Sequence, residues 1–240
     1  MQRHLRSVAI AAGLSVAVAV GAFGADQTIK GKGLTVKDGS SGTDPAKRKI
    51  SGKAAEKNSP NTLAGDPVTG GGTLEIQANG SNPTSQTFVL NQGISSTGKP
   101  FWSTAGNSGF KYKDSRGDQG PVKSLLIKRS PGGNFTIKAT VTGRNGTVVI
   151  VPPNPGTDGC MAVTLGGGGD RYSVQFGPES QVKNNGAKLF KAKKPTLEGI
   201  CPGGPATTTT TTTTTAPTTT TTLYGSPSRA FLDRALDLLD

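Results

Sequence analysis

The sequence has almost no histidine: among its 240 residues the only one is His4. Because the first 24 residues have the features of a cleaved leader, we expect the mature chain to contain none. This absence excludes Ser-His-Asp and Cys-His nucleophilic sites, histidine general bases and histidine metal ligands. We expect no catalytic residues, no bound metal and no cofactor, although an enzyme that uses only carboxylates would need no histidine.

Aromatic and other apolar residues are also scarce, at 5% and 32% of the chain. The 35 glycines, about 15% of the residues, bring the apolar total back into the range of globular proteins. Glycine and proline together stay just below the level typical of disordered chains. The composition therefore predicts a folded but glycine-rich body.

Long hydrophobic runs are absent except for one near the N-terminus, residues 8–23. It follows Arg3 and Arg6 and ends in small residues, Ala22 and Gly24, an order typical of a secretory signal peptide. The alternative is a transmembrane anchor, but the run is short for that role. We predict cleavage after Gly24, no transmembrane span in the mature chain, and a secreted, extracellular or periplasmic location.

Only two cysteines are present, Cys160 and Cys201. Export places them in an oxidising compartment, where a disulfide is the expected state; the alternative is two free thiols. Closing a loop of about 42 residues would stabilise the fold by roughly 4 kcal/mol in the chain-entropy model.

Positive charge predominates, with 27 basic against 15 acidic residues and a formal net charge of +12. Lysines that alternate along strands usually mark a solvated face and protected sheet edges. The alternative is an anionic partner, such as an acidic polysaccharide, another anionic surface polymer or a membrane surface. The sequence has no nucleic-acid-binding motif, and export makes nucleic acid the least expected partner.

Apolar and polar residues between positions 25 and 205 alternate with a period of two rather than 3.6, which indicates strands with one buried face. About ten short strands without intervening helices predict an all-β body, an antiparallel β-sandwich or jelly roll; a closed barrel is the alternative. Residues 122–128 and 147–151 are more continuously apolar, as central strands would be. The clearest alternating segments are 34–37, 74–77, 135–142 and 172–176.

Turn residues separate these segments. Asn145-Gly146, between two apolar segments, is the strongest hairpin signal. Residues 166–169 are all glycine and are also expected to form a hairpin turn, because they lack the Gly-Lys-Ser/Thr ending of a phosphate loop. The stretch 39–72 holds few apolar residues and is the weakest point for a single domain.

The composition changes beyond residue 205. Residues 206–225 are mostly threonine and have almost nothing to bury, which predicts a disordered Thr-rich linker. Ser226-Pro227 is typical of a helix start and predicts a short amphipathic helix over 226–240. The predicted organisation is a signal peptide (1–24), a β-sandwich domain (25–205), this linker and this helix.

The densest aromatic cluster consists of Phe101, Trp102, Phe110 and Tyr112. Flat rings on the surface of a β-sandwich can stack on the apolar faces of sugars, so these four are the candidate ligand-binding residues of a carbohydrate-binding module. The alternative interpretation is that the rings belong to the core.

Asp114 and Asp118 are the first and last residues of a short polar segment that contains an Arg-Gly-Asp tripeptide. They could share a calcium ion, but the segment lacks the ligand density of an EF-hand, so we predict a polar turn. A glycoside hydrolase would need a pair of carboxylates. Spacing singles out no pair among Asp114, Asp118, Asp158, Asp170 and Glu179.

Four short motifs carry a resemblance: Ile29-Lys30-Gly31-Lys32, Gly109-Phe110-Lys111-Tyr112-Lys113, Gly120-Pro121-Val122-Lys123 and Cys201-Pro202. With them, the segment from Ile29 to Pro202 resembles exported, glycine-rich β-proteins of environmental bacteria that carry no assigned function. The resemblance implies export and an all-β body. It implies no activity, cofactor or catalytic residue.

The sequence therefore favours a secreted or cell-surface, non-catalytic β-sandwich protein with a structural or binding role. A carbohydrate-binding module that uses the aromatic cluster is the first alternative. A carboxylate-dependent glycoside hydrolase is the second.

Overall fold

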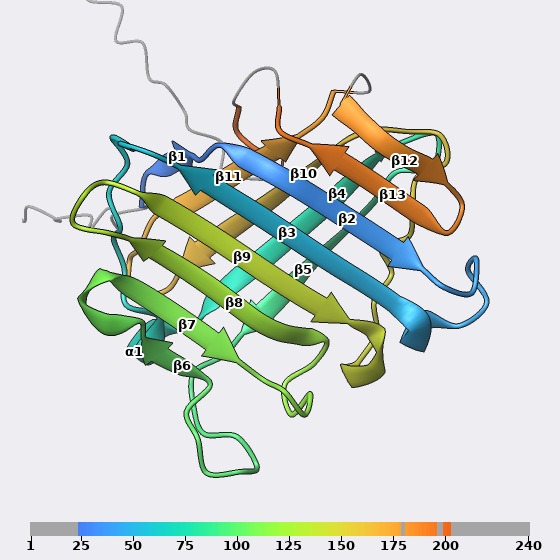
Figure 1. Cartoon of the computed structure of the whole chain (residues 1–240). Helices are drawn as coiled ribbons and strands as arrows, with labels where there is room; N and C mark the ends of the chain where they lie inside the picture. The colour runs from blue at the N-terminus through green and yellow to red at the C-terminus, as the bar shows by residue number, and fades with distance from the viewer. Residues whose placement is uncertain (1–23, 179–180, 196–198, 203–240) are drawn as a thin grey trace, which may run out of the picture. The chain divides into compact units, whose positions relative to one another are not determined.

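The computed structural model describes residues 24–178, 181–195 and 199–202. In this part of the chain, thirteen β-strands form two sheets that pack face to face (Figure 1). The predicted all-β sandwich is therefore confirmed, and the sheets are separate rather than joined in a closed barrel. Residues 1–23, the Thr-rich linker and the C-terminal helix predicted from the sequence lie outside the described residues.

The larger sheet has eight strands in the order β12-β13-β2-β3-β9-β8-β7-β6, and all neighbours in it are antiparallel. Its centre joins β3 to β9, which are far apart in the sequence. Its strands are β2 (Gly31–Asp38), β3 (Arg48–Glu56), β6 (Trp102–Thr104), β7 (Gly109–Lys113), β8 (Val122–Arg129), β9 (Phe135–Thr142), β12 (Val182–Gly186) and β13 (Leu189–Lys193).

The smaller sheet has five strands in the order β1-β11-β10-β4-β5. Its neighbours are antiparallel except for β1 and β11, which run parallel. In Figure 1 this sheet lies behind the larger one, and the strands of the two sheets cross. Its strands are β1 (Asp26–Thr28), β4 (Gly72–Gly80), β5 (Thr84–Leu90), β10 (Gly156–Leu165) and β11 (Arg171–Phe176).

Helical structure is limited to single turns in the described residues. The Asp66 carboxylate caps the turn over Pro67–Gly70 by accepting a hydrogen bond from the backbone N–H of Val68 at 3.0 Å, which is the usual role of aspartate before a helix. No helix in the described residues has the length and apolar character of a membrane span. The turns are α1 (Pro67–Gly70), η1 (Pro45–Lys47), η2 (Gly106–Ser108) and η3 (Gly143–Asn145).

The hydrophobic core fills the space between the two sheets. Both sheets contribute fully buried side chains to this core, among them Leu34 and Ile137 from the larger sheet and Leu74 and Ile76 from the smaller one. Burying a side chain of this size contributes about 1.5–3 kcal/mol each. The alternating segments predicted from the sequence all lie in strands, and the glycine run joins β10 to β11 as the predicted hairpin turn.

The hairpin predicted at Asn145-Gly146 is wrong. Strand β9 ends at Thr142, η3 turns the chain, and residues 147–155 cross to the smaller sheet without forming a strand. Val148 and Ile150 are fully buried, which explains their apolar character. An apolar run of this length indicates that the segment is buried, but it does not indicate whether the backbone pairs with a neighbouring strand.

The crossing segment covers the edge of β5. The side chain of Gln86 donates to the carbonyl of Thr147 at 3.0 Å and accepts from the N–H of Val149 at 2.9 Å. Thr84 bonds the N–H and the carbonyl of Val151 through its hydroxyl. The side chains thus replace backbone pairing and shield an edge that could otherwise recruit another strand.

Strand β3 lies inside the stretch that the sequence suggested as the weakest point of the domain. Its inward positions include the small residues Gly52 and Ala54, and a Cβ on Gly52 would lie 2.5 Å from the sulfur of Met161 on the opposite sheet. Glycine therefore makes room for a large side chain from across the core. Since β3 is a central strand, the stretch does not divide the domain.

Candidate functional site

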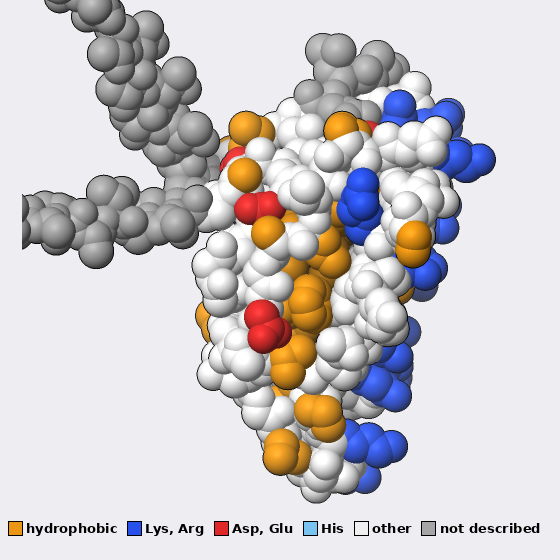
Figure 2. All heavy atoms as spheres, turned by 90° about the vertical axis from the view of Figure 1, so that its left-hand side faces the viewer, with side chains coloured by type: hydrophobic (Ala, Val, Ile, Leu, Met, Phe, Trp, Pro, Cys, Tyr) orange, Lys and Arg blue, Asp and Glu red, His pale blue; other side chains and the backbone are white. Residues whose placement is uncertain are grey.

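The outer face of the eight-stranded sheet carries most of the lysines of its strands, here called the lysine face. Alternation along each strand turns apolar residues toward the core and these lysines toward solvent, where all of them are exposed. Figure 2 shows the Lys and Arg side chains concentrated along one side of the molecule. The members of the lysine face are Lys37, Lys49, Lys53, Lys111, Lys113, Lys128, Lys138, Lys191 and Lys193.

The lysine face is electrostatically unbalanced. Lys37 lies directly opposite Lys49, and Lys53 lies directly opposite Lys138. Among the described residues, no aspartate or glutamate occupies an outward position of these strands, and no ion pair involves any of the nine lysines. Like charges directly across strands are destabilising, so the arrangement does not serve the stability of the fold.

A row of hydroxyl groups crosses the middle of the lysine face. Thr35, Ser51, Thr140 and Ser124 are in register across β2, β3, β9 and β8. With a strand spacing of about 4.8 Å, this hydroxyl row extends about 14 Å. None of its four side-chain hydroxyls has a hydrogen-bond partner in the described part of the chain, so all are available to a ligand.

Lysines lie on both sides of the hydroxyl row. On one side, Lys53 and Lys138 stand two residues further along their strands, about 7 Å away. On the other side, Lys37 and Lys49 occupy the equivalent positions. A chain molecule that follows the row across the strands would therefore have cations along both of its edges.

One side of the row is hollowed into a cleft of about 520 Å³. Its lining includes four cations and no carboxylate, together with hydroxyl and amide groups. This combination suits a ligand that carries negative charges and many hydroxyl groups. The polar lining residues are Thr35, Lys37, Lys49, Ser51, Ser115, Lys123, Thr140, Thr142, Arg144 and Asn145.

The loop between β7 and β8 forms one rim of this cleft and is held by Asp114. This carboxylate is 1% exposed and accepts hydrogen bonds from the N–H groups of Gly117 at 2.8 Å, Asp118 at 3.0 Å and Gln119 at 2.8 Å. The N–H of Asp114 also donates to the carbonyl of Lys123. The loop is therefore rigidly attached beside the cleft, which favours a preformed site.

A second buried carboxylate, Asp38, fixes the loop between β2 and β3 beside Lys37 and Lys49. It is 1% exposed, accepts from the hydroxyl of Ser40 at 2.7 Å and pairs with the Arg48 guanidinium at 3.1 Å. Burial by itself would raise the pKa of Asp38, but the hydrogen bonds from Ser40 and the charge of Arg48 outweigh it, and the pKa lies below its ordinary value. Asp38 therefore stays charged and paired at neutral pH.

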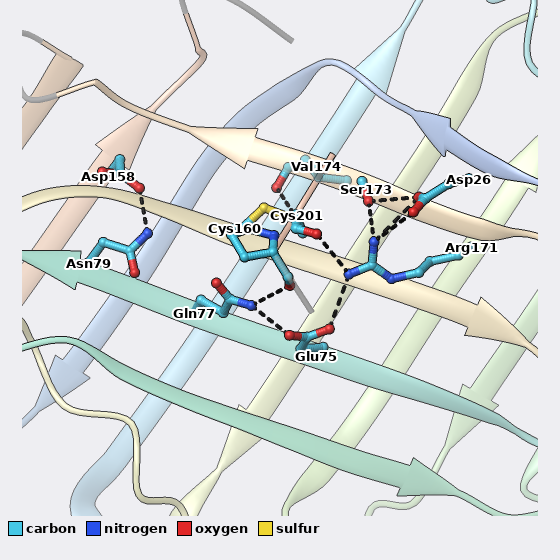
Figure 3. Close-up of a disulfide and its surroundings, with 11 residues drawn as sticks. Asp26, Glu75, Gln77, Asn79, Asp158, Cys160, Arg171, Ser173, Val174 and Cys201 are labelled. Carbon is cyan, nitrogen blue, oxygen red and sulfur yellow. Dashed lines mark hydrogen bonds and ion pairs between the residues drawn. A yellow bond between two sulfur atoms is a disulfide. The ribbon is translucent and has the colours of Figure 1, made fainter. Parts of the chain in front are cut away.

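The outer face of the five-stranded sheet has the opposite character. Its outward strand positions carry no lysine, and its one cation, Arg171, is 5% exposed. The Arg171 guanidinium pairs with Asp26 at 3.0 Å and with Glu75 at 3.2 Å, and it donates to the carbonyl of Cys201 (Figure 3). The cationic surface is thus confined to one of the two sheets.

The predicted disulfide between Cys160 and Cys201 is present beside Arg171 (Figure 3). The Cα atoms of the two cysteines are 5.7 Å apart. The bridge holds residues near Pro202, whose carbonyl accepts from Gln77 at 2.7 Å, against the outside of the smaller sheet. It contributes to the rigidity of the body and lies on the sheet opposite the lysine face.

The aromatic cluster lies in the core. Phe101, Trp102 and Tyr112 are 4%, 1% and 1% exposed, and Phe110 is partly buried against the same core. Burial, with the charges of nearby carboxylates adding to it, raises the pKa of Tyr112 well above its ordinary value, so this phenol stays neutral. No exposed ring face is left for sugar stacking at the three buried positions, which corrects the interpretation as a surface platform.

The other sequence candidates have structural partners. Asp118 accepts from the N–H of Ser96 at 2.7 Å, and Asp158 accepts from the amide of Asn79 at 2.6 Å. With Asp114 capping its own loop, the segment 114–118 is a polar turn as predicted. In the described residues no three Asp, Glu, His or Cys side chains are grouped as metal ligands; Glu179 lies outside them.

The alternating lysines are predictable from the sequence, whereas the hydroxyl row and the cleft are not. The row joins residues of β2, β3, β9 and β8, whose side-by-side order follows from pairing of distant strands. Lys-x-Lys and Ser/Thr residues recur at outward positions of the sequence. This pattern predicts that one face of the sheet is polar, but it does not predict which residues of neighbouring strands lie opposite one another.

Comparisons of the chain with protein family models, with curated proteins and with solved structures find no match. A proposal of function therefore has to rest on the geometry of the lysine face.

Proposed function

We propose that this protein is an exported, non-catalytic binding module that holds acidic polysaccharides on the lysine face of its larger sheet. The observation that carries the proposal is the hydroxyl row with unpaired lysines on both sides of it. Lysines supply attraction to carboxylate or sulfate groups, and the hydroxyl row supplies hydrogen bonds to sugar hydroxyls.

The chemistry of the face favours a polysaccharide over other polyanions. Three of the four cations that line the cleft are lysines and only Arg144 is an arginine, whereas arginine is the usual planar partner of phosphate and nucleic acid. The buried aromatic cluster offers no ring for base stacking, which single-stranded nucleic acids commonly use. The row places one hydroxyl side chain on each strand, about 4.8 Å from the next. This regular spacing suits a ligand that presents hydroxyl groups along its whole length.

The test measures binding of the exported protein to a carboxylated polysaccharide, a sulfated polysaccharide, a neutral polysaccharide and single-stranded DNA. We expect saturable binding to the two acidic polysaccharides and none to the neutral one. Affinity should fall about tenfold or more between about 50 and 200 mM salt, because binding releases counterions.

A variant separates specific binding from simple charge attraction. Thr140→Val removes one hydroxyl of the row without changing charge or shape, and should weaken polysaccharide binding several-fold while leaving attraction to DNA unchanged. Thr87→Val, on the outside of the smaller sheet, is the matched control and should change neither. Equal or tighter binding to DNA, unaffected by Thr140→Val, would contradict the proposal and indicate a nonspecific cationic surface.

A further inference from the structure

The first residues of the described chain are fixed in place beside a buried acid. Strand β1 pairs in register with β11, with Asp26 opposite Arg171. The N–H of Arg171 donates to the carbonyl of Ala25 at 2.9 Å, and the backbone nitrogen of Ala25 donates to the Asp170 carboxylate at 2.7 Å. The nitrogen of Ala25 therefore has one defined position, directly against a carboxylate oxygen.

Among the described residues, no cation pairs with Asp170. Asp170 is only 7% exposed. The second oxygen of its carboxylate accepts a hydrogen bond from the side-chain amide of Gln27, which is neutral. The neighbouring guanidinium of Arg171 is already used by Asp26 and Glu75. A buried carboxylate without a counter-charge is costly, since amide hydrogen bonds satisfy its oxygens but not its charge.

The residue before Ala25 has almost no room. A Cβ placed on Gly24 would lie 2.0 Å from the carbonyl oxygen of Gly169 in the β10–β11 turn. Only glycine, or no residue at all, fits at this point. The close fit and the unpaired acid both point to the same peptide bond, Gly24–Ala25.

We infer that the Gly24–Ala25 bond is a processing site and that the new α-ammonium of Ala25 is the missing counter-ion of Asp170. A peptidase of the exporting cell hydrolyses the bond before folding. One water molecule is consumed, the carbonyl of Gly24 leaves as a carboxylate, and the nitrogen of Ala25 becomes an ammonium group. Folding then places this group on Asp170, so that correct cleavage completes the folded body.

The inference is tested on the exported full-length protein and on one extended form. In the extended form, Gln-Gln-Gly is inserted between Gly24 and Ala25, so that cleavage after Gly24 leaves three extra residues and converts the Ala25 nitrogen to an amide, while the large Gln three residues before Ala25 prevents a second cleavage signal there. The glycine of the insert keeps the close fit against Gly169. Mass spectrometry should show Ala25 as the first residue of the natural form.

Thermal unfolding of Asp170→Asn in both forms measures the coupling between the ammonium and the acid. We expect Asp170→Asn to lower the Tm by on the order of 10 °C in the natural form and by much less in the extended form, because only the natural form loses an ion pair. Asp66→Asn, which keeps a good helix cap, is the control and should change neither Tm. Equal loss in the two forms would overturn the inference.

Two further measurements do not depend on the folding of Asp170→Asn. Gly24→Ala should give an exported protein with the same mass and Tm as wild type, because residue 24 is removed. A heavier protein with a lower Tm would show that residue 24 is retained. Acylation at neutral pH should also modify the Ala25 amine far more slowly in the folded wild-type protein than in urea, and equal rates would contradict its pairing.

Discussion

Replacing Lys37, Lys49 and Lys123 together by glutamine is expected to lower the affinity for acidic polysaccharide by about one hundred-fold. Each lysine close to an anionic surface contributes about 1 kcal/mol, and a loss of about 3 kcal/mol corresponds to that change. The three side chains line the cleft beside the hydroxyl row. Isothermal titration or surface plasmon resonance at low salt measures the change.

A matched triple variant separates the site from net charge. Lys57, Lys99 and Lys194 are exposed and lie outside the strands of the lysine face. Replacing these three by glutamine removes the same charge and should weaken binding only several-fold, through the long-range field. If the two triple variants lost affinity equally, binding would depend on overall charge and the cleft would have no special role.

Trp102→Ala is expected to destabilise the protein by about 3–5 kcal/mol, the usual loss for a large buried aromatic side chain. Trp102 is 1% exposed and packs edge-on against Tyr112 at a ring-centroid distance of 5.3 Å. Its ring N–H donates to the carbonyl of Leu90 at 3.0 Å. Because Trp102 is in β6 and Leu90 ends β5, this contact ties the two sheets together, and chemical denaturation measures its loss.

The same substitution distinguishes a core residue from a ligand platform. At a temperature where Trp102→Ala is still folded, its affinity for acidic polysaccharide should equal that of wild type, since the ring has no exposed face. Val89→Ala, at a side chain that is 60% exposed, should leave both stability and binding nearly unchanged. A folded Trp102→Ala protein that no longer bound the polysaccharide would restore the aromatic cluster as the site.

The fold class could be predicted because alternation within a strand is a local property. Residues 135–142, for example, alternate cleanly and form β9. Strand β3 escaped prediction because its inward positions include Gly52, whose small size is explained only by Met161 across the core. The hairpin at Asn145-Gly146 failed because Val148 and Ile150 are buried without a strand partner.

The site was less predictable than the fold because it depends on strand order. Lys49 and Thr142 are far apart in the sequence and become direct neighbours only through the pairing of β3 with β9. The aromatic cluster was the more conspicuous signal, but its rings serve the core. Composition can indicate a basic surface, whereas the register decides which lysines and hydroxyls share one face.

The most direct test of ligand binding on the lysine face is lysine footprinting in the presence of a carboxylated polysaccharide. The rate of acetylation of each lysine is measured by mass spectrometry with and without the polymer. We expect slowed modification of four lysines on both sides of the hydroxyl row, Lys37, Lys49, Lys53 and Lys138, while the rates of Lys57 and Lys99 stay unchanged. Uniform slowing of all lysines, or none on the lysine face, would contradict this expectation.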